Sequence, residues 1–146
     1  YPGEETSVHL TDIPETPSAW RNEALAAKWA KIRAARRVVT AALEVQRTAK
    51  VIGASLEAAP TVYVEARAQI GELSEADFAD ICITSGILVS TETAPEGAFV
   101  LEDVPGVVVV FHEADGEKCE RCWKILPDVG THSHAGTCAR CDEALS

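Results

Sequence analysis

The stretch CERCWKILPDVGTHSHAGTCARC, residues 119–141, contains two pairs of cysteines that decide how this part of the chain folds. Each pair has two residues between its thiols, and fifteen residues separate the pairs. This spacing is typical of four cysteines that bind one zinc ion. A tight turn presents two sulfurs at once, and the loop returns the second pair to complete a tetrahedron with Zn–S distances of about 2.3 Å. The sequence therefore predicts four zinc ligands, Cys119, Cys122, Cys138 and Cys141.

A shell of four thiolates leaves no open position for water, so the predicted zinc is structural rather than catalytic. His132 and His134 are competing ligands in the loop, but the four cysteines already satisfy zinc, and we expect both histidines to be exposed. Disulfides, free thiols or an iron–sulfur cluster are the alternatives. The module has few apolar residues, so the ion must supply its folding free energy, on the order of 10 kcal/mol.

Four thiolates and one Zn²⁺ leave a net negative charge, which nearby cations should offset. Lys118, Arg121 and Arg140 lie within or beside the cysteine pairs and are the candidates for this role.

The fifth cysteine and the first residues of the chain indicate the cellular compartment in which the protein is expected to function. Cys82 lies alone in the apolar stretch 79–89, and we expect it to be a small buried side chain. An odd cysteine count without a secretory signal indicates a reducing, cytoplasmic setting. No apolar run approaches the length needed to cross a membrane. The chain contains no Met, so we expect it to be a piece of a longer protein.

The formal net charge of −10 is unevenly distributed. Residues 20–50 have eight basic and two acidic residues, a charge of +6, whereas residues 51–116 have twelve acids and one base, a charge of −11. The segment 117–146 is close to neutral at −1. The overall charge therefore hides a basic segment that is compatible with a nucleic-acid partner.

A helix is predicted from Pro17 to about residue 51, with Thr16 as its cap and Gly53 as its terminator. The prolines before it predict an extended lead-in over residues 1–17. Apolar residues recur along one helix face at steps of three, four and seven, and the segment forms either one helix or two with a break near 26–27. They are Leu25, Trp29, Ile32, Val39 and Leu43.

The fold class is α+β. Strands are predicted at 61–65, 87–90, 98–101 and 107–111, with a sheet that buries the valine run of the last one. The capping spacing of Ser74 and Asp77 predicts a short helix over 74–81. We expect three parts: a helical segment at 1–58, a small α+β unit at 59–115 and the cysteine module at 116–146.

Two groups of residues are candidates for RNA contact. In the cysteine module, Arg121, Trp123 and Lys124 combine an aromatic ring for stacking with cations for phosphates. Alternatively, Trp123 packs against the valine-rich sheet. On the helix, a cluster of cations can line one side for a phosphate backbone, or it can be an ordinary solvated face that pairs with acids such as Glu44. These cations are Arg36, Arg47 and Lys50.

Three segments, in this order, resemble a known family. The run from Trp29 to Ala58 is similar to the end of the anticodon-binding helical region of bacterial-type isoleucyl-tRNA synthetases. It has Arg36, Val39, Glu44, Arg47, Lys50, Ile52-Gly53 and Ser55-Leu56-Glu57 at the matching positions. The lead-in from Ser7 to Glu15 resembles the preceding segment. Cys119-x-Arg121-Cys122-Trp123 with Cys138-x-Arg140-Cys141 resembles the zinc finger that closes the family.

The resemblance implies a class I synthetase that attaches isoleucine to its tRNA with ATP, with this chain contacting the anticodon end. The HIGH and KMSKS signatures are absent from the 146 residues, so this piece is expected to lack catalysis, editing and ATP binding. The expected partners are the isoleucine-accepting tRNA and the rest of the synthetase chain, in a monomer and without a membrane. The acidic block then acts as a spacer that positions the finger.

Two other classes of protein compete with this interpretation. DNA glycosylases that excise oxidised bases end in a similar finger, but they need an N-terminal catalytic proline followed by glutamate, which the start Tyr1-Pro2-Gly3-Glu4 does not supply. The second alternative is a purely structural zinc module that binds no RNA.

Overall fold

The computed structural model describes residues 7–10 and 12–146 and confirms the α+β class. The predicted lead-in at residues 1–6 and at residue 11 lies outside the described part. The 3-10 turn Val8–Leu10 interrupts the rest of the lead-in, which is therefore less extended than predicted. A second 3-10 turn, Ser18–Trp20, lies where the first turn of the helix was predicted.

One continuous helix, α1 (Glu23–Thr48), forms the basic segment. It begins after the predicted Thr16-Pro17 start because the backbone of Asn22 is extended and its side chain caps the helix, accepting a 2.9 Å hydrogen bond from the Leu25 N–H. The helix runs through residues 26–27 without a break. The prediction of the helix start was therefore wrong. Of the two predicted alternatives, one helix or two, the structure has one continuous helix.

The C-terminus of α1 is closed at Lys50 rather than at Gly53. Lys50 has φ 60°, in the left-handed region, and its N–H donates to the Arg47 carbonyl at 3.0 Å. The next N–H, that of Val51, donates to the Gln46 carbonyl at 3.0 Å. This pair of bonds is a Schellman motif, which satisfies the last carbonyls of the helix. A lysine therefore occupies the position where glycine is the usual choice.

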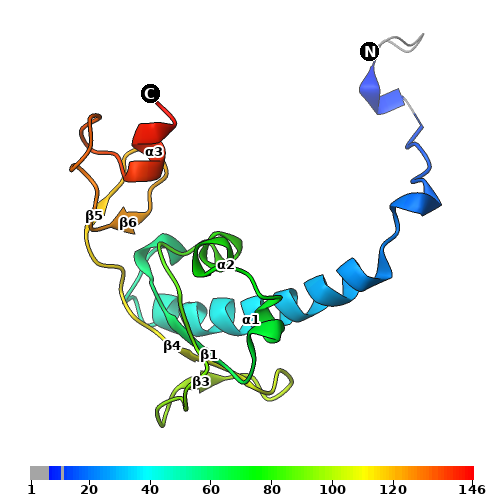
Figure 1. Cartoon of the computed structure of the whole chain (residues 1–146), viewed down its shortest axis with the longest axis horizontal. Coiled ribbons are helices and arrows are strands. Elements are labelled where there is room, and N and C mark those ends of the chain that lie inside the picture. The colour runs from blue at the N-terminus through cyan, green and yellow to red at the C-terminus, as the bar shows by residue number, and fades with distance from the viewer. Residues whose placement is uncertain (1–6, 11) are drawn as a thin grey trace.

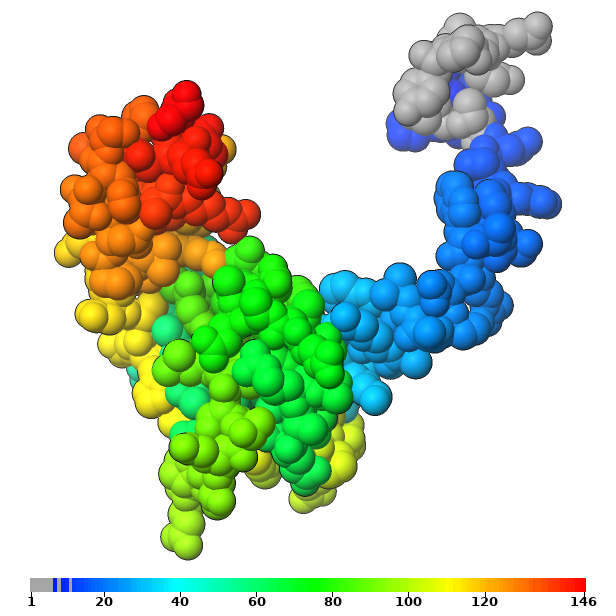
Figure 2. All heavy atoms as spheres, viewed as in Figure 1, coloured from blue at the N-terminus to red at the C-terminus, as the bar shows by residue number. Residues whose placement is uncertain are grey.

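Only part of the predicted apolar face of α1 is buried. Ile32, Val39 and Leu43 are buried, whereas Leu25 and Trp29 are exposed. Figure 1 gives the reason, because the first turns of α1 extend past the sheet and continue into the separate arm at the N-terminal side. Figure 2 shows the same arm standing clear of the body. Position along the helix, and not its apolar face, decides which of these residues are buried.

Four strands form the main sheet, in the order β2-β1-β4-β3. Their bounds are Thr61–Val64 for β1, Leu88–Ser90 for β2, Phe99–Val100 for β3 and Val107–Val110 for β4. The β1–β2 pair is parallel, and the connection between its strands contains the 3-10 turn Arg67–Ile70 and helix α2 (Glu75–Cys82). Both pairs that involve β4 are antiparallel.

The core lies between α1, α2 and one face of the sheet. Because strand side chains alternate between faces, Val62 and Val64 of β1 and Val107 and Val109 of β4 are buried together, while the other valines of β4 are half-buried. Phe78 of α2 is fully buried among them. The predicted burial of the valine run therefore applies to alternate residues.

The cysteine module follows the sheet as a small separate cluster, with the hairpin of β5 (Glu117–Lys118) and β6 (Ile125–Leu126) and the short helix α3 (Ala139–Glu143). Figure 1 shows it in orange and red beyond the sheet. None of the helices among the described residues combines the length and the apolar character that a membrane crossing requires.

Candidate metal centre and nucleic-acid interface

The two cysteine pairs sit in two different kinds of turn. In the first turn, the Trp123 N–H donates to the Cys119 carbonyl at 2.9 Å, and the Cys119 N–H donates to the Lys124 carbonyl at 2.8 Å. In the second, Cys138 is the N-terminal cap of α3, and its carbonyl accepts from the Cys141 N–H at 2.9 Å. Backbone hydrogen bonds therefore hold both turns, and the side chains of the cysteines remain available.

These turns bring the four sulfurs together. Single ligand atoms from Cys119, Cys122, Cys138 and Cys141 all lie within 4.8 Å of one another, and the Cys122 and Cys138 sulfurs are 3.8 Å apart. A tetrahedron with Zn–S bonds of about 2.3 Å has sulfur–sulfur edges of about 3.8 Å. All four are free cysteines, so neither pair forms a disulfide. The donor set and its spacing fit a tetrahedral zinc ion.

The thiols of the cluster do not ionise equally easily. Burial opposes ionisation of Cys119, but backbone N–H groups of Cys122, Cys138 and Arg121 outweigh it and lower the pKa of this thiol to about 6. Burial raises the pKa of Cys122 to about 12. Four thiolates in so small a volume repel one another, so a bound cation is what makes the fully ionised set favourable.

The two loop histidines face carboxylates and not the sulfur cluster. Nε2 of His132 lies 3.0 Å from Asp128 Oδ2, and Nδ1 of His134 lies 2.8 Å from Asp142 Oδ1. A backbone hydrogen bond from Ala139, followed by His132, lowers the pKa of Asp128. The expected exposure holds for His134, whereas His132 is half-buried. Both histidines organise the loop between the cysteine pairs.

Trp123 is exposed and held in an uncommon backbone conformation. Its relative exposure is 62%, so it does not pack against the valine-rich sheet. Its φ of 66° is in the left-handed region, where a bulky residue costs about 1–2 kcal/mol relative to glycine. The Lys118 ammonium lies 5.5 Å from the centre of the indole ring, within cation–π range. The finger therefore presents a flat aromatic surface beside a cation.

The other predicted cations of the finger have partners within the protein, although Arg121 and Arg140 are exposed. Nη1 of Arg121 lies 3.7 Å from the Cys141 sulfur, so this residue is placed to offset the charge of the cluster. Lys124 and Arg140 both reach Asp80 on α2. The guanidinium of Arg140 thus pairs with Asp80, and the ammonium of Lys118 lies over the indole ring.

The three predicted cations of α1 do not form one row. Nε of Arg36 donates to the Ile81 carbonyl at 2.8 Å in the contact between α1 and α2. Arg47 is exposed and pairs with Glu44, as the alternative interpretation of the sequence expected. Lys50 is exposed beyond the end of the helix. Only Arg47 and Lys50 are placed to meet a ligand directly.

Cys82 is buried, as predicted, and burial raises the pKa of its thiol to about 12. A thiol with such a pKa is not a nucleophile near neutral pH. The residue that the sequence did not single out is Asp80. Its position two residues before Cys82 in an apolar stretch gave no indication that it meets the finger more than forty residues later.

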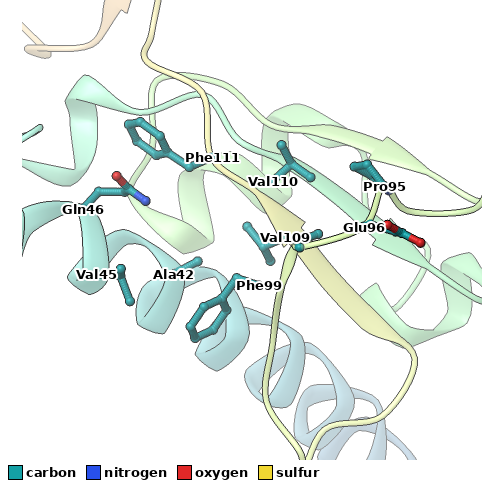
Figure 3. A pocket seen from close by; sticks show the side chains of 11 residues that line it. Ala42, Val45, Gln46, Pro95, Glu96, Phe99, Val109, Val110 and Phe111 are labelled. Atoms are coloured by element: carbon teal, nitrogen blue, oxygen red, sulfur yellow. The ribbon is translucent and has the colours of Figure 1, made fainter.

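A hollow of about 410 Å³ lies between α1 and the strands β3 and β4 (Figure 3). Its lining is mostly apolar, and it includes Ala42, Phe99 and Phe111, with Gln46 and Glu96 as the polar side chains. No histidine, cysteine or serine is among the residues that line it. The hollow therefore contains no serine–histidine or cysteine–histidine pair of the kind used in covalent catalysis.

Comparison with known proteins identifies similarity both in the finger and along the rest of the chain. Residues 116–144 match the family model described as the zinc finger found in FPG and IleRS. The isoleucine–tRNA ligase of Ruegeria pomeroyi is 60% identical over 145 residues, which are 99% of this chain and 15% of that relative. Those of Brucella abortus and Agrobacterium fabrum are 55% and 52% identical over 89% and 90% of the chain.

The chain thus spans only about 15% of the length of the curated relatives that it matches. The similarity extends beyond the finger, because 99% of the chain aligns with the first of these relatives. The finger match and the sulfur cluster together indicate a zinc ion. These findings confirm that the chain resembles the isoleucyl-tRNA synthetases and includes their four-cysteine zinc finger.

Proposed function

We propose that this chain is the tRNA-binding, anticodon-end part of an isoleucine–tRNA ligase, an enzyme that joins isoleucine to its tRNA with ATP. The names of the relatives and the 99% coverage of this chain support the proposal. The 146 residues contain neither the HIGH nor the KMSKS signature, so catalysis, editing and ATP binding are assigned to the remainder of the enzyme. The proposed setting is a monomer in the cytoplasm.

In this proposal, Cys119, Cys122, Cys138 and Cys141 hold one structural zinc ion. The 3.8 Å distance between two of the sulfurs supports this assignment, because it equals the edge expected for tetrahedral coordination. When bound, the ion supplies charge neutralisation and folding free energy to the finger. The proposed parts are a helical segment at 1–58, an α+β unit at 59–115 that shares one core with α1, and the finger at 116–146.

The observation that most supports RNA contact is Trp123. The indole is exposed, its ring meets the Lys118 ammonium rather than the core, and its residue lies in the left-handed region. Strained residues of this kind are enriched at functional sites. Stacking of a base on such a ring contributes about 1–3 kcal/mol. We therefore assign stacking to Trp123 and phosphate contact to the exposed cations Arg47 and Lys50. Arg36, Arg121 and Lys124 contribute by holding the surface in shape.

A fluorescence titration tests this assignment. In the Trp20→Phe/Trp29→Phe double variant, Trp123 is the sole tryptophan, and the replaced residues lie in the exposed arm and first turns of α1. Isoleucine-accepting tRNA should quench this fluorescence with an affinity that falls as salt rises. The matched control retains Trp20 and Trp29 and carries Trp123→Phe, and its fluorescence should respond far less.

The outcome also separates the competing functions. Binding of duplex DNA in preference to tRNA would favour the glycosylase class, in which the same kind of finger occurs. No binding of either nucleic acid by the zinc-loaded chain would leave a purely structural module. Loss of tRNA binding on treatment with a chelator, with recovery on addition of zinc, would support the proposed role of the finger.

A further inference from the structure

Two separate segments of the finger converge on one carboxylate of the α+β unit. Asp80, near the end of α2, accepts from the Lys124 ammonium with Oδ1 and from Arg140 Nη1 with Oδ2, the latter at 3.1 Å. Lys124 precedes β6, whereas Arg140 belongs to α3. The hydrogen bond from Lys124 is the largest influence on Asp80 and lowers the pKa of its carboxyl. One acid thus holds both halves of the finger.

A buried hydroxyl lies next to this ion pair. Ser85 Oγ accepts a 2.7 Å hydrogen bond from the Ile125 N–H of the finger, and it donates to the Leu56 carbonyl. Ser85 is buried, so the contact is shielded from water. Lys124, which pairs with Asp80, and Ile125, which donates to Ser85, are neighbours in the chain. Together these two contacts fix the position and the orientation of the hairpin relative to α2.

The linker to the finger pairs with the segment that precedes β1. Ala58 and Glu113 form a β-bridge, and the Ala114 N–H donates to the Glu57 carbonyl at 2.8 Å. Gly116 follows with φ 112°, and a Cβ there would lie 2.3 Å from the Leu126 carbonyl. The linker therefore enters the finger through a tight, glycine-dependent passage, and Asp80 and Ser85 provide the further points of attachment.

We propose that Asp80 is a positioning residue that docks the finger on α2 and thereby fixes Trp123 relative to the basic end of α1. This inference rests on the proposed function for its RNA-binding consequence. Without the Asp80 pairs, the single hydrogen bond between Ser85 and Ile125 would remain, and the finger would sample more orientations around its linker. Only a fraction of the molecules would then present both surfaces correctly, and the apparent affinity would fall to that fraction of its full value.

The direction in which Asp80→Asn changes RNA affinity distinguishes a positioning role of Asp80 from a simple effect of its charge. Asp80→Asn makes the chain less negative, so the average field alone would strengthen RNA binding. The proposal predicts the opposite, a dissociation constant about threefold to tenfold larger, as expected for the loss of two ion pairs at the surface. Asp103→Asn is the matched control, because it removes the same charge from an exposed pair with Arg37 that does not involve the finger.

Residual dipolar couplings of the zinc-loaded chain test the docking without RNA. In the unmodified chain, one alignment tensor should fit both residues 59–115 and residues 116–146. Asp80→Asn should require two tensors while keeping one zinc per chain. The Asp80→Lys/Lys124→Asp/Arg140→Gln triple variant reverses the pair with Lys124 and removes the like charge that Arg140 would place beside the new ammonium, and it should restore a single tensor.

Each result decides a different part of the proposal. A single tensor in Asp80→Asn would overturn the docking role, and so would a failure of the reversed pair to restore it. Unchanged or tighter tRNA binding by Asp80→Asn, with two tensors, would overturn the link between orientation and RNA. If the unmodified chain binds no tRNA, the proposed function fails, and the tensors still decide the docking.

Discussion

Nε of Arg36 on α1 donates a 2.8 Å hydrogen bond to the carbonyl oxygen of Ile81 at the end of α2. The guanidinium is partly buried in this contact, which satisfies one of the last carbonyls of α2. A residue that the sequence presented as a candidate RNA contact therefore joins the two helices that frame the sheet.

Arg36→Met should lower the free energy of unfolding by about 1–3 kcal/mol, because it leaves a carbonyl acceptor unpaired in a partly buried place. Urea unfolding followed by far-UV circular dichroism measures this change. Arg33→Met is the matched control on the exposed surface of the same helix and should change stability by less than about 0.5 kcal/mol. Equal effects of the two substitutions would contradict the assigned role.

Cys138→Ser should abolish stoichiometric zinc binding, because three sulfurs do not complete the tetrahedral shell. Metal analysis of the purified chain should give one zinc per molecule before the substitution. Cys82→Ser is the control, since this buried thiol lies in the core of the α+β unit and outside the sulfur cluster. Retention of full zinc by Cys138→Ser would refute the ligand assignment.

Trp123→Gly should separate stability from RNA binding. Glycine adopts the left-handed conformation of this position freely, so the zinc-loaded finger should be about 1 kcal/mol more stable, measured as resistance to thermal unfolding. The same substitution removes the stacking surface and should weaken tRNA binding by about tenfold. Trp123→Ala should weaken binding similarly without the gain in stability. A loss of stability in the glycine variant would show that the indole supports the fold.

In the complete enzyme, Trp123→Ala should reduce aminoacylation of tRNA and leave isoleucine-dependent ATP–pyrophosphate exchange unchanged. Exchange requires no tRNA, and the finger is assigned no part in it. Comparison of the two assays on one preparation makes the test independent of protein concentration. Parallel loss of both activities would instead assign Trp123 to the folding of the whole enzyme.

Phe78→Ala should destabilise the α+β unit by about 3–5 kcal/mol, because Phe78 is fully buried between α2 and the sheet. Calorimetric unfolding of the zinc-loaded chain measures the effect. Leu88→Ala is the control, since Leu88 lies on the outer strand β2 and is 61% exposed. A similar cost for both substitutions would contradict the described core.

Sequence patterns correctly predicted those elements of this chain that depend only on interactions between residues close in sequence. Ser74 caps α2 as its spacing indicated, and its side chain accepts from the Asp77 N–H at 3.1 Å. The cysteine spacing brought the sulfurs together because two short turns and one loop suffice to do so. The start of α1 was missed because Asn22 competes with Thr16 as a cap, and a single sequence does not rank the two.

The sequence by itself determined the α+β class, the four-sulfur cluster and the resemblance to the isoleucyl-tRNA synthetases, since periodicity and spacing act over short distances along the chain. Tertiary structure alone decided which cations remain free for a ligand. Arg36 is engaged by Ile81, and Lys124 and Arg140 by Asp80, residues more than forty positions away. The physical reason is that a charged side chain takes whichever acceptor the packed fold brings within reach, and only the folded chain defines that set.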